Sequence, residues 1–211
     1  MVTAGESTPR RPRRGQGRSV RQHILDATSE LLAERSFNEF SVADILTRAN
    51  VARGTFYFHF GSKHEVLAEL VRRTVARGHE AAHPSLGHEA EGQRRNTIRY
   101  GVAESARLWR EHPHILRAIV ENWRSDPGLA ELWLEQMSTF TATTEARLAA
   151  DAAAGVLRDD IPDTKALATA LTWLGERLHY LAAIDVAPLN DEEQLVDVLT
   201  HIWMSTLYAR D

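Results

Sequence analysis

Apolar residues recur along this chain at steps of three and four, the period of an α-helix, and no long run alternates apolar with polar residues. We therefore expect an all-α protein of about nine helices. The expected helices span residues 19–35, 41–49, 52–59, 62–78, 93–111, 113–123, 127–154, 163–184 and 191–209. Prolines at 113, 127, 162 and 188 fall at predicted helix starts or breaks, where proline is tolerated.

The second predicted helix and the corner after it carry strong local signals. Ser41 can cap the helix, and Asp44, three residues later, fits a capping box. Asn50 follows the last apolar position and tolerates the left-handed backbone of a tight corner. A short helix over 52–59 then completes a helix-turn-helix, with the first helix packed behind it.

The segment VARGTFYFHF, residues 51–60, contains five rings in a row and is too short to bury them all. At about 100° per residue, Phe56 and Phe60 share an inward face, whereas Arg53 and Tyr57 share an adjoining stripe. Arg53 can donate two hydrogen bonds to a guanine edge, and Tyr57 offers a flat ring and a hydroxyl. The pattern predicts a helix that enters the major groove of DNA.

Composition and charge agree with a nucleic-acid-binding front half. The chain has a formal net charge of −4, but residues 1–80 hold 13 Lys/Arg against 9 Asp/Glu, and the remainder holds 12 against 20. The first 22 residues contain six arginines and one glutamate among Pro, Gly and Ser. We interpret residues 1–19 as a disordered basic arm that contacts phosphates or the minor groove, or that serves only as a solubilising tail.

Several function classes lack sequence support. The chain has no cysteine, no secretory signal and no apolar run long enough to span a bilayer, so we expect a cytoplasmic protein without a membrane partner. Neither a glycine-rich phosphate loop nor a nucleophile–base set is present, so we expect no cofactor and no enzymatic activity. A stretch rich in Gly, Pro and His, residues 79–92, divides a helix-turn-helix domain (20–80) from a larger domain (81–211).

The stretch SVADILTRANVARGTFYFHFGSKHEVLAEL resembles the DNA-binding region of TetR-family transcriptional repressors. Asn50 and Ala52 stand where the family usually has Gly and Ser or Thr. The resemblance implies binding of a palindromic double-stranded operator by a homodimer whose last two helices meet. It also implies DNA contacts from Ser41, Arg53, Gly54, Thr55, Tyr57, His59 and Lys63.

The second domain has the pattern of a small-molecule sensor. All five tryptophans follow residue 100. Trp133, Met137, Phe140 and Thr144 form one helical stripe, and Thr172, Glu176 and Tyr180 form another at steps of four. The segments ELWLEQM, ALATAL, GERL and HIWMSTLY resemble the subgroup that regulates an ethionamide-activating monooxygenase, which implies a long apolar tunnel and release from DNA by a lipophilic effector. The implied lining is Trp109, Trp133, Met137, Phe140, Thr144, Thr172, Glu176, Tyr180 and Trp203. Each of these residues could instead fill the core.

Two alternatives remain open at this stage. His79, Glu80 and His83 form HEAAH, a spacing that can bind zinc on a helix, but Pro84 disfavours helical geometry at the second histidine. We therefore expect no metal site, and a zinc hydrolase is the weaker alternative. The other alternative is a DNA-binding protein without a ligand, whose second domain would have a filled core.

Overall fold

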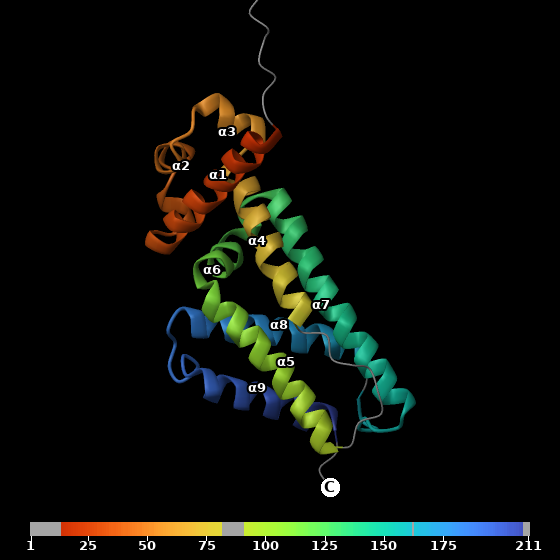
Figure 1. Ribbon diagram of the computed structural model, residues 1–211. Helices are drawn as coiled ribbons and strands as arrows, with labels where there is room; N and C mark the ends of the chain where they lie inside the picture. Colours follow the sequence, from red (N-terminus) through yellow and green to blue (C-terminus); the bar gives the residue numbers. More distant parts are fainter. Residues whose placement is uncertain (1–13, 82–90, 162, 209–211) are drawn as a thin grey trace, which may run out of the picture. The chain divides into compact units, whose positions relative to one another are not determined.

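The computed structural model describes residues 14–81, 91–161 and 163–208, and in these ranges it contains helices and no strand (Figure 1). The predicted all-α fold is confirmed. The helices are α1 (Arg14–Glu34), η1 (Phe37–Glu39), α2 (Val42–Ala49), α3 (Arg53–His59), α4 (Lys63–Ala81), α5 (Glu91–Glu111), α6 (Pro113–Asn122), η2 (Trp123–Ser125), α7 (Pro127–Ala153), α8 (Thr164–Ala183) and α9 (Glu192–Leu207).

Two helices, α1 and α4, extend furthest beyond their predicted bounds. α1 begins at Arg14, so the segment from Arg14 that we assigned to the basic arm is helical, while residues 1–13 lie outside the described residues. No proline interrupts residues 14–18, so the backbone can continue the helix towards the N-terminus. α4 continues past Gly78 to Ala81 because a single glycine weakens a helix without ending it.

The chain forms two compact units that divide after Val66, inside α4. The first unit holds α1, η1, α2, α3 and the first turn of α4, and the second holds the rest. We had expected the boundary in the stretch 79–92, most of which lies outside the described residues. The domain limits 20–80 and 81–211 therefore stay a prediction.

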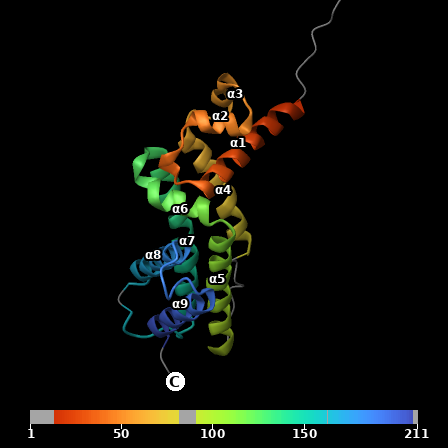
Figure 2. The ribbon, with the colours of Figure 1, turned by 90° about the vertical axis from the view of Figure 1, so that its left-hand side faces the viewer.

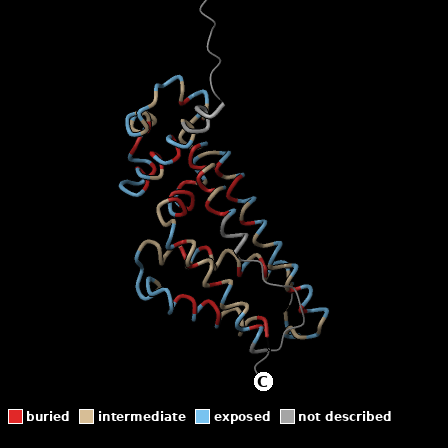
Figure 3. The backbone as a smooth tube through the Cα atoms, viewed as in Figure 1, coloured by how far each residue is buried: buried red, intermediate tan, exposed pale blue. Residues whose placement is uncertain are grey.

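The first unit is built around apolar side chains that its three main helices share. Ile24 of α1, Ile45 of α2 and Phe56 of α3 are completely buried, and Phe37 of η1 is 1% exposed. Figure 3 shows the buried parts of the backbone in red. Ion pairing adds to this packing, since Arg48 of α2 donates hydrogen bonds of 2.9 and 2.7 Å to the Glu34 carboxylate of α1. The Arg48 guanidinium lowers the pKa of Glu34.

The corner between α2 and α3 is built as the sequence predicted. Asn50 has φ 52° and ψ 50°, the left-handed conformation, and its backbone N–H donates to the carbonyls of Leu46 and Thr47. Because only glycine, asparagine and aspartate visit this region routinely, Asn50 can replace the glycine that such corners commonly use.

The second unit is a bundle in which α7 packs on α8, and α5 packs on both α8 and α9 (Figure 2). One buried cluster joins Val102 and Ala106 of α5 to Leu195, Val196 and Leu199 of α9. A second joins Leu148 of α7 to Leu171 of α8 and Leu207 of α9. These contacts hold the four long helices α5, α7, α8 and α9 around an internal cavity. None of the described helices has the length and apolarity that crossing a membrane requires.

Replacing Asn50 tests the corner. We expect Asn50→Ala to lower the free energy of unfolding by about 1 kcal/mol, because alanine is strained at positive φ. Asn50→Gly, the matched control, should stay within about 0.5 kcal/mol of the original, because glycine adopts this conformation freely. Urea denaturation followed by circular dichroism measures both, and equal losses for the two variants would contradict the proposed role of φ.

Candidate DNA-binding face and ligand cavity

The short helix α3, called the reading helix below, presents different residues to its two sides. Phe56 is completely buried and Phe60, its C-terminal neighbour at i+4, is 3% exposed. Arg53 and Tyr57 are exposed, as the spacing predicted. The two inward rings also contact each other, with centroids 6.2 Å apart. The helix is therefore anchored by its phenylalanines and shows its polar groups to solvent.

Arg53 and Tyr57 interact along the exposed face of the reading helix. The Arg53 guanidinium lies 5.3 Å from the centre of the Tyr57 ring, and its Nη2 donates to the Tyr57 hydroxyl over 3.4 Å. Thr55 and His59 are partly exposed on the same helix. A Cβ added to Gly54 would meet no atom within 4 Å, so the backbone surface there is open to a close-approaching partner.

Phe58 is a feature of the reading helix that sequence reasoning missed. Its side chain is 83% exposed, and its ring makes a T-shaped contact with the His59 ring, with centroids 5.1 Å apart. The signal was available, since a helix that turns Phe56 and Phe60 inward must turn the residue midway between them outward. An exposed apolar ring beside donors suits contact with a thymine methyl group.

The start of α2 is closed by its own capping box. The Asp44 carboxylate accepts hydrogen bonds of 2.7 Å from both the backbone N–H and the hydroxyl of Ser41. These bonds lower the pKa of Asp44. Ser41 is exposed, yet its hydroxyl proton is already donated within the protein. A phosphate at this position would therefore meet an occupied hydroxyl beside a carboxylate.

The start of α4 is closed by a variant of the capping box. The Ser62 hydroxyl accepts from the backbone N–H of Glu65 over 3.2 Å, as a capping box requires. The Glu65 carboxylate, however, accepts from Gly61 at 2.8 Å, one residue before the position that the pattern predicts. The reciprocal bond thus fixes the loop that leaves the reading helix.

Lys63 has a structural role that its sequence position did not reveal. Its ammonium donates to the backbone carbonyls of Phe37 and Phe40, both at 2.9 Å, and lies 4.4 Å from the centre of the Phe37 ring. Partial burial lowers the pKa of this lysine. The ammonium therefore joins the first turn of α4 to the segment before α2, and it retains one N–H for an outside acceptor.

In the second unit, α5, α7, α8 and α9 enclose a cavity of about 270 Å³, with Val75 of α4 also on its wall. The lining includes all the predicted ligand residues except Tyr180: Trp109, Trp133, Met137, Phe140, Thr144, Thr172, Glu176 and Trp203. Tyr180 faces elsewhere, and its hydroxyl donates to Glu121 of α6 over 3.2 Å. The helical step of four from Glu176 predicted that Tyr180 faces the cavity, but its side chain lies on the other side of the cavity wall.

Most of the α5 wall of the cavity was missing from the sequence prediction, which included only Trp109 of this helix. α5 also contributes Thr97, Ile98, Gly101, Val102, Ser105 and Leu108, and the rest of the second unit contributes Arg147, Leu148, Gly175, His179 and Tyr208. The steps between Thr97, Gly101, Ser105 and Leu108 are helical, but small and hydroxylated residues give no strong apolar signal. Only the packing of α5 against α8 and α9 identifies that face as internal.

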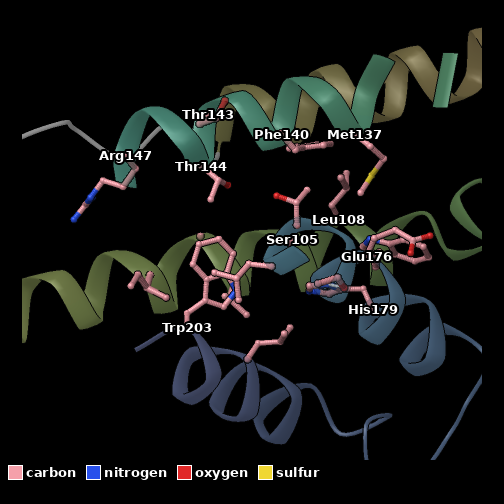
Figure 4. Close-up of a pocket in the computed structure, with 18 of the residues that line it drawn as sticks. Ser105, Leu108, Met137, Phe140, Thr143, Thr144, Arg147, Glu176, His179 and Trp203 are labelled. Atoms are coloured by element: carbon pink, nitrogen blue, oxygen red, sulfur yellow. Dashed lines mark hydrogen bonds between the residues drawn. The ribbon is translucent and has the colours of Figure 1, made fainter. Parts of the chain in front are cut away.

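Charged side chains mark the two ends of the cavity. Figure 4 shows Glu176 of α8 at one end and Arg147 of α7 at the other, with Met137, Phe140 and Thr144 between them. Arg147 pairs with Asp151 at 3.1 Å, and that carboxylate also accepts from the Tyr208 hydroxyl at 2.6 Å. The Asp151 carboxylate and burial together raise the pKa of Tyr208.

His179 lies beside Glu176 on the same helix and is 3% exposed. Its Nδ1 is 2.6 Å from the carbonyl of Gly175, and its ring stacks on Trp109 with centroids 6.4 Å apart. Burial lowers the pKa of His179, which keeps the ring neutral near pH 7. A neutral ring that donates from Nδ1 adds no positive charge to this end of the cavity.

Comparison with known proteins decides the family. A model of the C-terminal domain of the transcriptional regulator EthR matches residues 98–209, and a model of bacterial regulatory proteins of the tetR family matches residues 24–70. The EthR of Mycolicibacterium smegmatis is 35% identical over 99% of this chain and 97% of its own. The chain belongs to the TetR family of transcriptional regulators. Within that family it is of the EthR type.

Further relatives agree with this assignment to the TetR family. EthR of Mycobacterium tuberculosis H37Rv is 30% identical over 96% of this chain and 93% of its own. A solved tetR-family regulatory protein from Rhodococcus RHA1 superposes with a TM-score of 0.73 over 91% of this chain and 98% of its own, at 16% identity, which supports the fold.

The family corrects the HEAAH alternative. TetR-family relatives of this chain are named transcriptional regulators, so the chain is not an enzyme. In the structure, His79 and Glu80 lie in the last turn of α4, and His83 lies outside the described residues. The spacing that suggested zinc therefore arises where a helix ends, next to Pro84.

Removing the Lys63 ammonium tests its structural role. We expect Lys63→Met, which keeps the aliphatic stem, to lower the free energy of unfolding by about 2 kcal/mol, because two carbonyls lose a charged donor. The matched control is Lys165→Met, which alters the chain's other lysine, exposed at the start of α8. Thermal and urea denaturation without DNA measure both, and an unchanged midpoint for Lys63→Met would contradict the role.

Proposed function

We propose that this TetR-family regulator is a repressor that binds a palindromic operator as a homodimer and is released by a small lipophilic effector. The observation that carries the DNA part is the reading helix, with its phenylalanines inward and Arg53 and Tyr57 outward. The observation that carries the effector part is the cavity of about 270 Å³ in the second unit.

At the operator, the reading helix enters the major groove and Arg53 donates to a guanine edge. Tyr57 holds the guanidinium by stacking and hydrogen bonding, so Arg53 is partly ordered before it meets DNA. Gly54 allows close approach of the backbone, Thr55 and His59 add polar contacts, and Phe58 adds an apolar one. Lys63 contributes at the phosphates through its remaining N–H, in addition to its structural bonds. Ser41 contributes there by turning its hydroxyl proton from the Asp44 carboxylate to a phosphate oxygen.

The homodimer forms through α8 and α9. Several apolar residues of these helices are incompletely covered within one chain, among them Leu174, Leu181 and Val198, the last 38% exposed. Leu171, Leu195, Leu199 and Leu207 of the same two helices are buried inside the second unit. The partner face therefore consists of the apolar residues that remain partly exposed.

Effector binding favours a state of the dimer whose reading helices no longer fit successive major grooves. A tenfold release from DNA requires about 1.4 kcal/mol of differential affinity between the two states. α4 is one continuous helix that belongs to both units, so it is the element through which the cavity can influence the DNA-binding unit. Val75 supports this proposal because it places α4 on the cavity wall. The cavity favours this proposal over a ligand-independent DNA-binding protein, for which we expected a filled core.

Arg53 is the test of the reading helix. We expect Arg53→Ala to weaken binding to the preferred operator by about 1–3 kcal/mol and to relax preference at one base position per half-site, because a bidentate contact is lost. Arg35→Ala, an exposed arginine at the end of α1, is the matched control. Operators selected from random duplexes and fluorescence anisotropy measure both effects. Equal weakening on all sequences would contradict base recognition by Arg53.

Val198 is the test of the dimer face. We expect Val198→Asp to convert the dimer to monomers, because a charge would be buried at the partner contact. The matched control is Val186→Asp, since Val186 is 39% exposed in the link between α8 and α9. Sedimentation velocity measures the assembly. A dimer that survives Val198→Asp, or that is lost equally in both variants, would contradict this face.

A further inference from the structure

Glu176 is a carboxylate buried at one end of an otherwise largely apolar cavity. Its side chain is 5% exposed, and it lines the space between α5, α7 and α8. Burial raises its pKa because the ionised form loses hydration. A buried ionised carboxylate is costly unless a cation or several donors stand against it.

Within the protein, the negative charge of the Glu176 carboxylate is only weakly neutralised. Among the described residues, the one cation paired with Glu176 is Arg177, whose Nε lies 3.9 Å from Oε2. Arg177 is the next residue on α8, its side chain is 53% exposed, and its guanidinium lies 5.1 Å from the Tyr180 ring centre. At such a distance and exposure, solvent screens the attraction. No described residue donates a hydrogen bond to Glu176, so its oxygens can accept from a bound molecule.

The cavity that holds Glu176 is lined by several aromatic rings, namely Trp109, Trp133, Phe140 and Trp203. Trp109 stacks on His179 beside Glu176, whereas Figure 4 shows Trp203 nearer the Arg147 end. Aromatic faces attract cations, and the attraction is strongest where water is excluded. The neighbouring His179 is neutral, so it offers no competing positive charge to Glu176. This end of the cavity therefore favours positive charge on two independent grounds, the carboxylate and the rings.

Arg147, the charged residue at the opposite end of the cavity, does not form an ion pair with Glu176. Arg147 pairs with Asp151, its neighbour at i+4 on α7, and Figure 4 shows its side chain directed away from the Glu176 end. The stretch between the two ends is lined by Met137, Phe140, Leu108 and the methyl-bearing threonines 143 and 144. A molecule in this space would lay an apolar body along α7 and place its polar head at α8.

We propose that the effector site takes an aliphatic ammonium on an apolar body, with the ammonium paired to Glu176 and the body between α5 and α7. A neutral hydroxyl or amide head would leave the carboxylate without a counter-charge, and a carboxylate head would be repelled by it. This inference rests on the proposed effector function of the cavity. It adds the chemical class of the ligand and the residue that selects it.

Matched small probes test the inference directly. Isothermal titration calorimetry at pH 7.5 would compare 3-phenylpropylamine with 3-phenylpropan-1-ol, 3-phenylpropanamide and 3-phenylpropanoate, all of which have the same body. With the unmodified protein we expect the amine to bind at least tenfold more tightly than the other three. Amine binding no tighter than the alcohol, amine binding too weak to detect, or a preference for the amide or the acid would each overturn the proposal.

A variant pair assigns the preference to Glu176. In Glu176→Gln the advantage of the amine over the alcohol should fall below about threefold, while alcohol affinity stays within about threefold of the original. Glu135→Gln, which alters an exposed carboxylate on α7, should keep the full amine preference. Circular dichroism checks that both variants fold. A preference that survives Glu176→Gln, or that disappears in Glu135→Gln, would overturn the assignment, and the probe series with the unmodified protein stands even if Glu176→Gln is unstable.

Operator release separates this inference from the function on which it rests. Amine binding that depends on Glu176 and that also weakens operator binding supports both. Amine binding that depends on Glu176 but leaves operator affinity unchanged supports the ligand class and overturns the effector function. Operator release by the alcohol or acid without amine preference supports the effector function and overturns the ligand class.

Discussion

The burial of two phenylalanines four residues apart, Phe56 on a helix of only seven residues and Phe60 just after its end, is the constraint on which the DNA-binding unit depends. A helix this short has little stability of its own, because nucleation fixes several residues before the hydrogen bonds repay the cost. Phe56 and Phe60 supply the packing that holds it. Once they point inward, Arg53, Tyr57 and Phe58 have to point outward. The same contact that stabilises the helix therefore sets which groups can reach DNA.

Two polar residues near this helix, Lys63 and Ser41, stabilise the fold and are also proposed to contact DNA. Lys63 gives two of its three donors to carbonyls before α2, and Ser41 gives its hydroxyl proton to Asp44. Such bonds fix the positions of these groups and reduce what they can offer a phosphate. Loss of DNA binding on mutation of Lys63 would thus combine lost contacts with a displaced scaffold. Stability measured without DNA is the quantity that separates the two.

The second unit combines a well-packed framework with an internal cavity. Close packing is the rule in protein cores, and a space of about 270 Å³ among tryptophans and leucines forgoes dispersion energy that ordinary packing would supply. A buried carboxylate with one distant, exposed partner adds a further cost. Both costs are relieved if a molecule of the right size and charge occupies the space. Relief of these two costs would contribute to the binding free energy of such a molecule.

Local sequence was sufficient for features that depend on neighbours along the chain. Helical spacing, the Ser41 capping box, the left-handed Asn50 and the inward pair Phe56 and Phe60 all follow from contacts within a few residues. The Trp133, Met137, Phe140 and Thr144 stripe was found for the same reason, since all four belong to one helix. Helical steps of four likewise gave Thr172, Glu176 and Tyr180, and family resemblance supplied Trp109 and Trp203. Of these five residues, Tyr180 lies off the cavity.

Tertiary structure alone decided what depends on distant segments. The α5 wall of the cavity, the carbonyls that engage Lys63, and the orientation of Tyr180 towards Glu121 are set by helices far apart in sequence. The placement of Glu176 and Arg147 at opposite ends of the cavity also depends on how α7 and α8 pack. Periodicity states which face of a helix is apolar, but not which partner covers that face or how much space remains, because both depend on how whole helices pack.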